Sequence, residues 1–77
     1  MKTVQVLGPG CRKCDETAAV VREVVAESGV DAEIVKVDDL KEITAMGVFA
    51  TPAVAVDGVV KVTGRVPRKD DVKAWLA

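Results

Sequence analysis

The sequence contains no histidine and no tyrosine, and only one tryptophan and one phenylalanine among its 77 residues. Without histidine, Ser–His–Asp and Cys–His catalytic arrangements are excluded, and so are metal sites that use imidazole. Only two cysteines are present, so a single chain cannot build a four-cysteine zinc site. The chemistry that remains centres on the two thiols.

Charge and hydropathy argue against several kinds of partner. The formal net charge is -1, from 11 basic and 12 acidic residues, and no basic stripe is interleaved with aromatics, so we expect no nucleic-acid partner. No apolar run approaches the ~18 residues of a membrane span. The first four residues lead directly into a strand pattern rather than a signal peptide, so we expect a cytoplasmic protein with no membrane partner. In that compartment a cysteine pair is catalytic or metal-binding more often than structural.

The length and the periodicity predict one domain, residues 1–77, which we expect to be a monomer with a valine-rich core. Strands are expected at residues 3–7, 30–37, 53–56 and 59–62, and helices at residues 11–28, 40–46 and 67–76. Asp57-Gly58 predicts a two-residue hairpin turn. The order β-α-β-α-β-β-α, with a right-handed crossover between the first two strands, predicts the α/β class.

The first helix carries an apolar stripe made of Cys14, Ala18, Val21 and Val25, which recur at steps of four, three and four. Cys11 lies three residues before Cys14, at the start of the helix. The pattern therefore predicts an exposed Cys11 and a shielded Cys14. A thiolate at a helix N-terminus faces unpaired N–H groups and the positive end of the helix dipole, and both favour the charged form.

The spacing Cys11-Arg12-Lys13-Cys14 suits dithiol–disulfide exchange, because two intervening residues on the first turn of a helix bring the sulfurs within bonding distance. Cys11 would attack a substrate disulfide, and Cys14 would then attack Cys11 and release the product. Arg12 and Lys13 favour the thiolate, whereas the acidic residues that follow Cys14 oppose them.

Two alternative functions use the same region. The first is a soft-metal, copper-type binding domain or metallochaperone, because two thiolates also bind Cu(I). Metal-binding domains of that type have a ferredoxin-like fold, which has no helix between its second and third strands and ends in a strand. The second is a binding module without turnover, in which Val48 and Phe49 form an exposed apolar patch beside the thiols. We interpret Phe49, like Trp75, primarily as a core residue.

Four motifs occur in an order typical of thioredoxin-fold proteins. They are Gly8-Pro9-Gly10-Cys11-Arg12-Lys13-Cys14, Ala50-Thr51-Pro52, Ala55-Val56-Asp57-Gly58 and Gly64-Arg65-Val66. On these motifs the chain resembles the small glutaredoxin-like, thioredoxin-fold redox-active disulfide protein family over all its residues. The resemblance implies a thioredoxin-like fold with a central four-stranded mixed sheet flanked by three helices.

The resemblance also implies a thiol–disulfide oxidoreductase in which Cys11 is the nucleophile and Cys14 the resolving thiol. It implies that Pro52 is cis and packs against the disulfide, that the Thr51 backbone pairs with an extended substrate segment, and that Gly64 lets the chain pass close to the site. Its partners would be protein disulfides and an electron donor of the thioredoxin-reductase type.

Gly10, Arg12 and Lys13 complete the expected substrate-binding residues. No metal and no cofactor are expected beyond the Cys11–Cys14 disulfide.

Around the cysteines the chain departs from the patterns of thioredoxin and glutaredoxin. Thioredoxin proper has tryptophan before the first cysteine and Gly-Pro between the two, where this chain has Gly10 and Arg12-Lys13. The buried carboxylate on the first strand of thioredoxin has no counterpart in residues 3–7, so the proton of Cys14 must leave through water or another group. The aromatic and acidic motifs with which glutaredoxins bind glutathione are absent, which argues against glutathione as a substrate.

Overall fold

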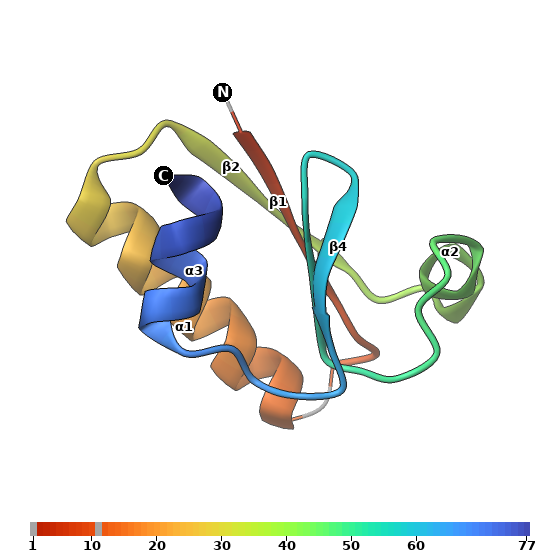
Figure 1. The fold of residues 1–77 in the computed structure, drawn as a ribbon. Coiled ribbons are helices and arrows are strands. Elements are labelled where there is room, and N and C mark those ends of the chain that lie inside the picture. Colours follow the sequence, from red (N-terminus) through yellow and green to blue (C-terminus); the bar gives the residue numbers. More distant parts are fainter. Residues whose placement is uncertain (1, 11) are drawn as a thin grey trace.

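The structure, a computed structural model, describes residues 2–10 and 12–77. The elements are β1 (Lys2–Leu7), α1 (Arg12–Ser28), β2 (Ala32–Val37), α2 (Leu40–Ala45), β3 (Ala53–Val56), β4 (Val59–Thr63) and α3 (Lys69–Leu76), as Figure 1 shows. The strands lie in the order β2-β1-β3-β4, with β1 parallel to β2 and the other pairs antiparallel. Within the described residues, the predicted α/β fold with a four-stranded mixed sheet and three helices is confirmed.

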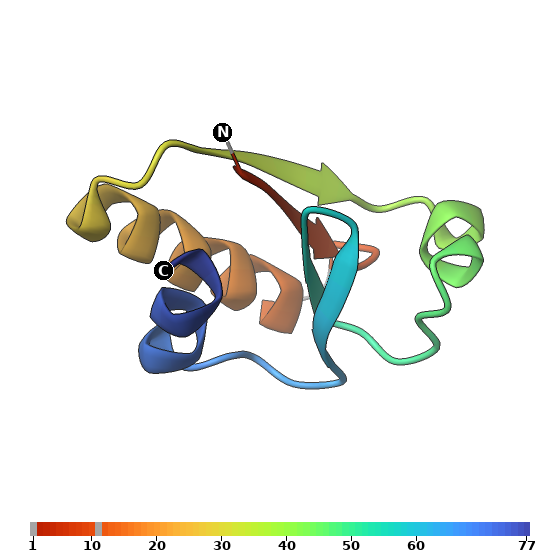
Figure 2. The ribbon, with the colours of Figure 1, turned by 45° about the horizontal axis from the view of Figure 1, so that its top comes forward.

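Side chains alternate along β1, and the strand contributes buried apolar residues to both faces of the sheet. Val4 and Val6 face the core that α1 and α3 cover, whereas Leu7 packs on the opposite face with Ile43 of α2. Figure 2 shows α1 and α3 lying side by side, with α2 set apart from them beyond the end of β2. A strand buried on both faces needs apolar residues at consecutive positions, which accounts for the uninterrupted burial of β3.

Helix α1 turns one side towards the sheet and α3. Its buried side chains are Cys14, Thr17, Ala18, Val21 and Val24. The predicted stripe is correct in its first three members, but Val24 rather than Val25 takes the deep position, and Val25 is half-buried. Val24 and Val25 lie three and four residues after Val21, so both are near the same face of the helix, and packing determines which of the two is buried. Thr17 is tolerated inside because its hydroxyl donates to the Lys13 carbonyl at 2.8 Å.

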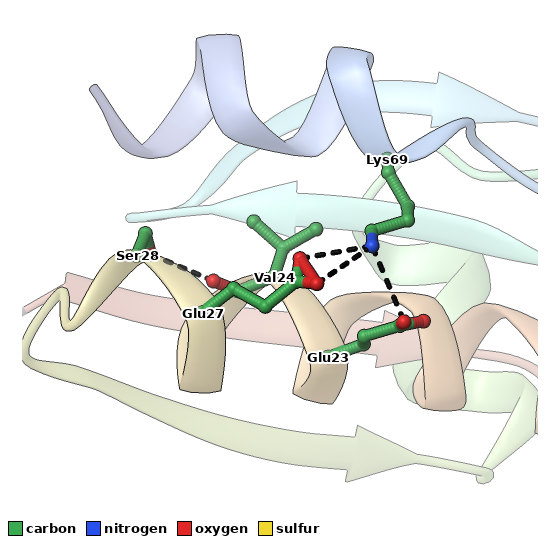
Figure 3. A network of polar contacts seen from close by, with 5 residues as sticks. All are labelled: Glu23, Val24, Glu27, Ser28 and Lys69. Atoms are coloured by element: carbon green, nitrogen blue, oxygen red, sulfur yellow. Dashed lines mark hydrogen bonds and ion pairs between the residues drawn. The ribbon is translucent and has the colours of Figure 1, made fainter.

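A polar network links α3 to the exposed side of α1 (Figure 3). The Lys69 Nζ atom lies 3.2 Å from Glu23 Oε1 and 2.8 Å from Glu27 Oε2. Hydrogen bonding by Lys69 lowers the pKa of Glu27, and the hydrogen bonds to Glu27 and then Glu23 raise the pKa of Lys69. Directly after Glu27, the Ser28 hydroxyl donates to the Val24 carbonyl at 2.7 Å. The two helices are thus joined at the surface as well as through the core.

The β3–β4 hairpin closes at the predicted turn. Asp57 and Gly58 have φ values of 50° and 83°, and positive values at both central residues define a type I′ turn. The turn is also attached to the start of β1. The Thr3 N–H donates to Asp57 Oδ1 at 2.9 Å, and the Asp57 N–H donates to the Thr3 carbonyl at 2.9 Å.

The last helix begins two residues later than predicted. Pro67 was expected in its first turn, but α3 starts at Lys69 with Arg68 as the N-cap residue. The Asp71 carboxylate accepts the Arg68 N–H at 3.2 Å, so the acidic residue sets the start of the helix. That backbone hydrogen bond and the nearby Arg65 lower the pKa of Asp71.

Candidate active site

The end of β1, the first turn of α1, the segment before β3 and the end of β4 gather at one end of the sheet, at the bottom of Figure 1. The Gly8 N–H donates to the Val37 carbonyl at 2.9 Å, which extends the pairing of β1 with β2 by one residue. Pro9 and Gly10 are exposed, and Gly10 has a φ of 86°. That left-handed conformation suits glycine, and it directs the chain from the strand into α1.

The structure describes only one of the two cysteines, Cys14. Cys11 lies outside the described residues, so its predicted exposure stays a prediction. Cys14 is 4% exposed, which confirms that it is shielded. Arg12 and Lys13 between them are exposed, and Arg12 Nε lies 3.8 Å from Glu16 Oε1.

Gly8 lies directly against the sulfur of Cys14. A Cβ atom placed on Gly8 would overlap Cys14 Sγ, and it would lie 3.1 Å from Cys14 Cβ and 3.8 Å from Thr51 Cβ. The absence of a side chain at Gly8 therefore allows Cys14 and Thr51 to occupy the same corner of the molecule. Sequence analysis named Gly8 only as the first residue of the cysteine motif and gave it no contact with Cys14. Its position, one residue past a buried strand and before a buried cysteine, was the available signal.

The Thr51–Pro52 peptide bond is cis, and Pro52 is buried while Thr51 is half-buried. The Gly64 N–H donates to the Pro52 carbonyl at 2.8 Å. Gly64 has a φ of 76°, and a Cβ there would lie 3.3 Å from Ala50 Cβ. The structure thus brings Cys14, Thr51, Pro52 and Gly64 to one end of the sheet, with Gly10 at the adjoining turn.

A small cavity of about 70 Å³ opens beside Cys14. Its lining residues are Val6, Gly8, Gly10, Cys14, Asp15, Lys36 and Asp38. Lys36 Nζ lies 3.7 Å from Asp15 Oδ1 across the gap between β2 and α1. Sequence reasoning did not connect these charges with the cysteines. Lys36 interrupts the apolar alternation of its strand, and that irregularity was the signal.

Phe49 is not a core residue, and that interpretation was wrong. Its side chain is 85% exposed, whereas Val48 is buried among residues of the second core cluster. The two neighbours therefore form no joint exposed patch. Val48 packs in the core cluster with Leu7 and Ile43, and Phe49, the next residue, does not.

The fold also distinguishes between the two functions that the sequence left open for the cysteine pair, disulfide exchange and soft-metal binding. Helix α2 lies between β2 and β3, and the last element is α3, so the architecture is not that of the ferredoxin-like metal-binding domains. Among residues 2–10 and 12–77 no cluster of three or more metal-ligating side chains is found. In the same residues, no helix combines the length and the apolar character that a membrane crossing needs.

Comparison with known proteins agrees with this architecture. The family model described as "Thioredoxin domain" matches residues 2–77. A protein named thioredoxin from Methanocaldococcus jannaschii is 45% identical over 76 residues, which cover 99% of this chain and 87% of that protein. A second thioredoxin, from Methanothermobacter thermautotrophicus, is 39% identical over 77 residues, which cover all of both chains. The chain therefore belongs to the thioredoxin family and is a dithiol–disulfide oxidoreductase.

Proposed function

We propose that this oxidoreductase acts through Cys11 as the attacking thiol and Cys14 as the resolving thiol. The observation that carries the proposal is the position of Cys14. It is buried on the first turn of α1, against Gly8 and next to Thr51, three residues after Cys11. A buried thiol is poorly placed to meet a protein substrate, but it is well placed to attack a neighbouring sulfur.

The proposed reaction has two steps. The Cys11 thiolate attacks one sulfur of a substrate disulfide, a Cys11–substrate bond forms, and the other substrate sulfur leaves as a thiolate. The Cys14 thiolate then attacks the Cys11 sulfur, the Cys11–Cys14 bond forms, and the second substrate sulfur leaves with the bonding electron pair. The substrate disulfide gains two electrons, and the protein dithiol loses them.

Substrate binding is proposed for the residues around this corner, with Thr51 at its centre. Pairing of β3 with β4 begins at Ala53, and the Thr51 main chain makes no backbone hydrogen bond to another described residue. A polar main chain that has no protein partner is suited to pair with an extended peptide. Gly64 holds the Pro52 carbonyl from the other side, and it fixes the segment that would receive the peptide.

Exposed Gly10, Arg12 and Lys13 would form the opposite edge of this binding region. Membership of the thioredoxin family implies protein disulfides as substrates and a reductase as partner in general. For this chain we propose a donor of the thioredoxin-reductase type, a cytoplasmic location, no cofactor besides the Cys11–Cys14 disulfide, and a single monomeric domain of residues 1–77.

Alkylation of the cysteines across defined redox buffers tests the proposal. We expect a two-electron midpoint between about -120 and -270 mV, the range of known dithiol–disulfide oxidoreductases. Cys14→Ser should accumulate mixed disulfides with protein substrates, and Cys11→Ser should not, since only the first retains the attacking thiol. Tight stoichiometric copper binding without disulfide reductase activity would instead favour the metal-binding alternative.

A further inference from the structure

The resolving step requires a Cys14 thiolate, and the structure restricts how that thiolate forms. Cys14 is 4% exposed, and burial penalises the charged form of a thiol. Val6 of strand β1 lines the cavity, and Gly8, just after the strand, lies next to the sulfur; neither side chain can accept a proton. The proton must therefore leave through another side of the site.

We propose that the cavity beside Cys14 is this route, and that Asp38 receives the Cys14 proton through water. This inference rests on the proposed function, in which Cys14 is the resolving thiol. The cavity of about 70 Å³ exceeds the roughly 10–15 Å³ that one water molecule requires. Ordered water also needs polar partners, and the cavity provides Cys14 and three charged side chains.

The charged residues that face the cavity come from two sides. Asp15 comes from α1, whereas Lys36 and Asp38 come from β2 and the residue that follows it. The adjoining β1 and turn contribute Val6, Gly8 and Gly10, which do not titrate.

Asp38 is the better acceptor of the two aspartates. Lys36 Nζ lies 3.7 Å from Asp15 Oδ1, so its charge already offsets that of Asp15. Within the described part of the chain, Asp38 has no ion pair or hydrogen bond of its side chain to a protein group. The next residue, Asp39, has a separate task, because its carboxylate accepts the Lys41 N–H at 2.9 Å and caps α2.

The proton and electron pairs balance along this route. Water in the cavity takes the proton from Cys14 Sγ and passes a proton to the Asp38 carboxylate. The Cys14 thiolate attacks Cys11 in the mixed disulfide, and the substrate sulfur departs as a thiolate. Asp38 is exposed, so it returns its proton to solvent after the step.

The resolving step is measured separately from the first attack by mixing reduced protein with less than one equivalent of 5,5′-dithiobis(2-nitrobenzoate). The first coloured thiolate reports attack by Cys11, and the second reports its displacement by Cys14. We expect Asp38→Asn to slow the second release about 10- to 100-fold near pH 7, at or below the low end of general-base effects because water relays the proton. The first release should stay unchanged.

The pH profile and two further variants exclude a merely structural effect. The second release should vary little around neutral pH in the wild type, and it should rise about tenfold per pH unit in Asp38→Asn, where hydroxide becomes the base. Asp38→Glu keeps the carboxylate and should recover most of the rate. Asp39→Asn is the matched control: it removes the same charge from the adjacent residue, keeps a good N-cap, and should behave like the wild type.

The outcomes are distinguishable. A second release in Asp38→Asn within twofold of the wild-type rate overturns the proton route, and so does an equal loss in Asp39→Asn. In both cases the roles of Cys11 and Cys14 stand. A wild-type protein that releases only the first thiolate overturns the resolving role of Cys14, and the inference falls with it.

Discussion

Gly8→Ala should destabilise the protein through one contact, between the new methyl group and the sulfur of Cys14. The backbone at Gly8 cannot easily shift, because its N–H is bonded to the Val37 carbonyl at 2.9 Å and the residue directly follows a paired strand. Cys14 is held in the first turn of α1. The sulfur itself must therefore move, and the space beside it is the cavity of about 70 Å³.

The expected magnitude follows from two opposing effects. Adding a methylene-sized group to a packed interior costs about 1–3 kcal/mol. Replacing glycine by alanine where the backbone permits it returns about 0.4–1 kcal/mol through the unfolded state. Gly8 is not among the positive-φ glycines, so the second effect applies. The net loss should be about 1.3 kcal/mol, the difference between the middle values of these two ranges, about 2 and about 0.7 kcal/mol.

The same substitution should behave differently once the sulfur is removed. In a Cys14→Ala background the remaining close contact is with Cys14 Cβ, at 3.1 Å, and a small shift relieves it. Only the unfolded-state gain then remains, so Gly8→Ala should be neutral or slightly stabilising there. The coupling between the two substitutions should be about 1.3–2 kcal/mol, the loss with the sulfur plus the gain without it, well outside the ~0.5 kcal/mol of independent sites.

Urea denaturation of the four proteins under reducing conditions measures this coupling, with Trp75, the single tryptophan, as the fluorescent probe. The partly buried position of Trp75 against the main core makes its emission sensitive to unfolding. If Gly8→Ala costs the same with and without the Cys14 sulfur, the reasoning from steric overlap is refuted.

Three further predictions concern the surroundings of the site and the helix pair. Gly64→Ala should lower the free energy of unfolding in urea by about 1–2 kcal/mol, because φ is 76° and Ala50 Cβ lies close to the added methyl group. Asparagine tolerates a positive φ, so Gly64→Asn should lower the free energy of unfolding by less, and an equal loss would contradict the backbone argument. The pKa of Glu27 is lowered, so the stabilising contribution of this carboxylate is present above its ordinary pKa of 4.5 and is lost as the pH falls through the lowered pKa. Lys69→Met should therefore reduce the stability at neutral pH and flatten the acid side of the curve of stability against pH. An unchanged acid side would show that the ion pair is not responsible. Phe49→Ser should change the unfolding free energy by less than about 0.5 kcal/mol, since the ring is 85% exposed, and a larger loss would mean that the ring packs in solution.

Local sequence signals predicted the elements best where one backbone requirement dominates. Asp57-Gly58 is such a place, because a two-residue turn with both φ values positive favours these residue types. The start of α3 was predicted less well. Pro67 suits the first turn of a helix, but the Asp71 carboxylate bonds to the Arg68 N–H and sets the start two residues later. Such competition between two acceptable starts is decided by side-chain geometry.

The site was predictable only as far as one helix could reveal it. The period of α1 correctly placed Cys14 on the buried side. Gly8 and the charged cavity were missed because they depend on how α1 meets the ends of β1 and β2 in space. Composition alone favoured burial of Phe49, but its neighbour Val48 already occupies the core position.

The paired hydrogen bonds between Thr3 and Asp57 have a consequence for the opposite end of the sheet. Separating the first residues of β1 from the sheet would also release the β3–β4 turn. Fraying from the N-terminal end therefore has to break the hydrogen bonds of β1 and of the turn together. Amide protons at Thr3 and Asp57 should consequently exchange together rather than independently. A label or fusion partner joined ahead of Lys2 would act on this hydrogen-bonded end of the sheet, at the opposite end of β1 from Cys14.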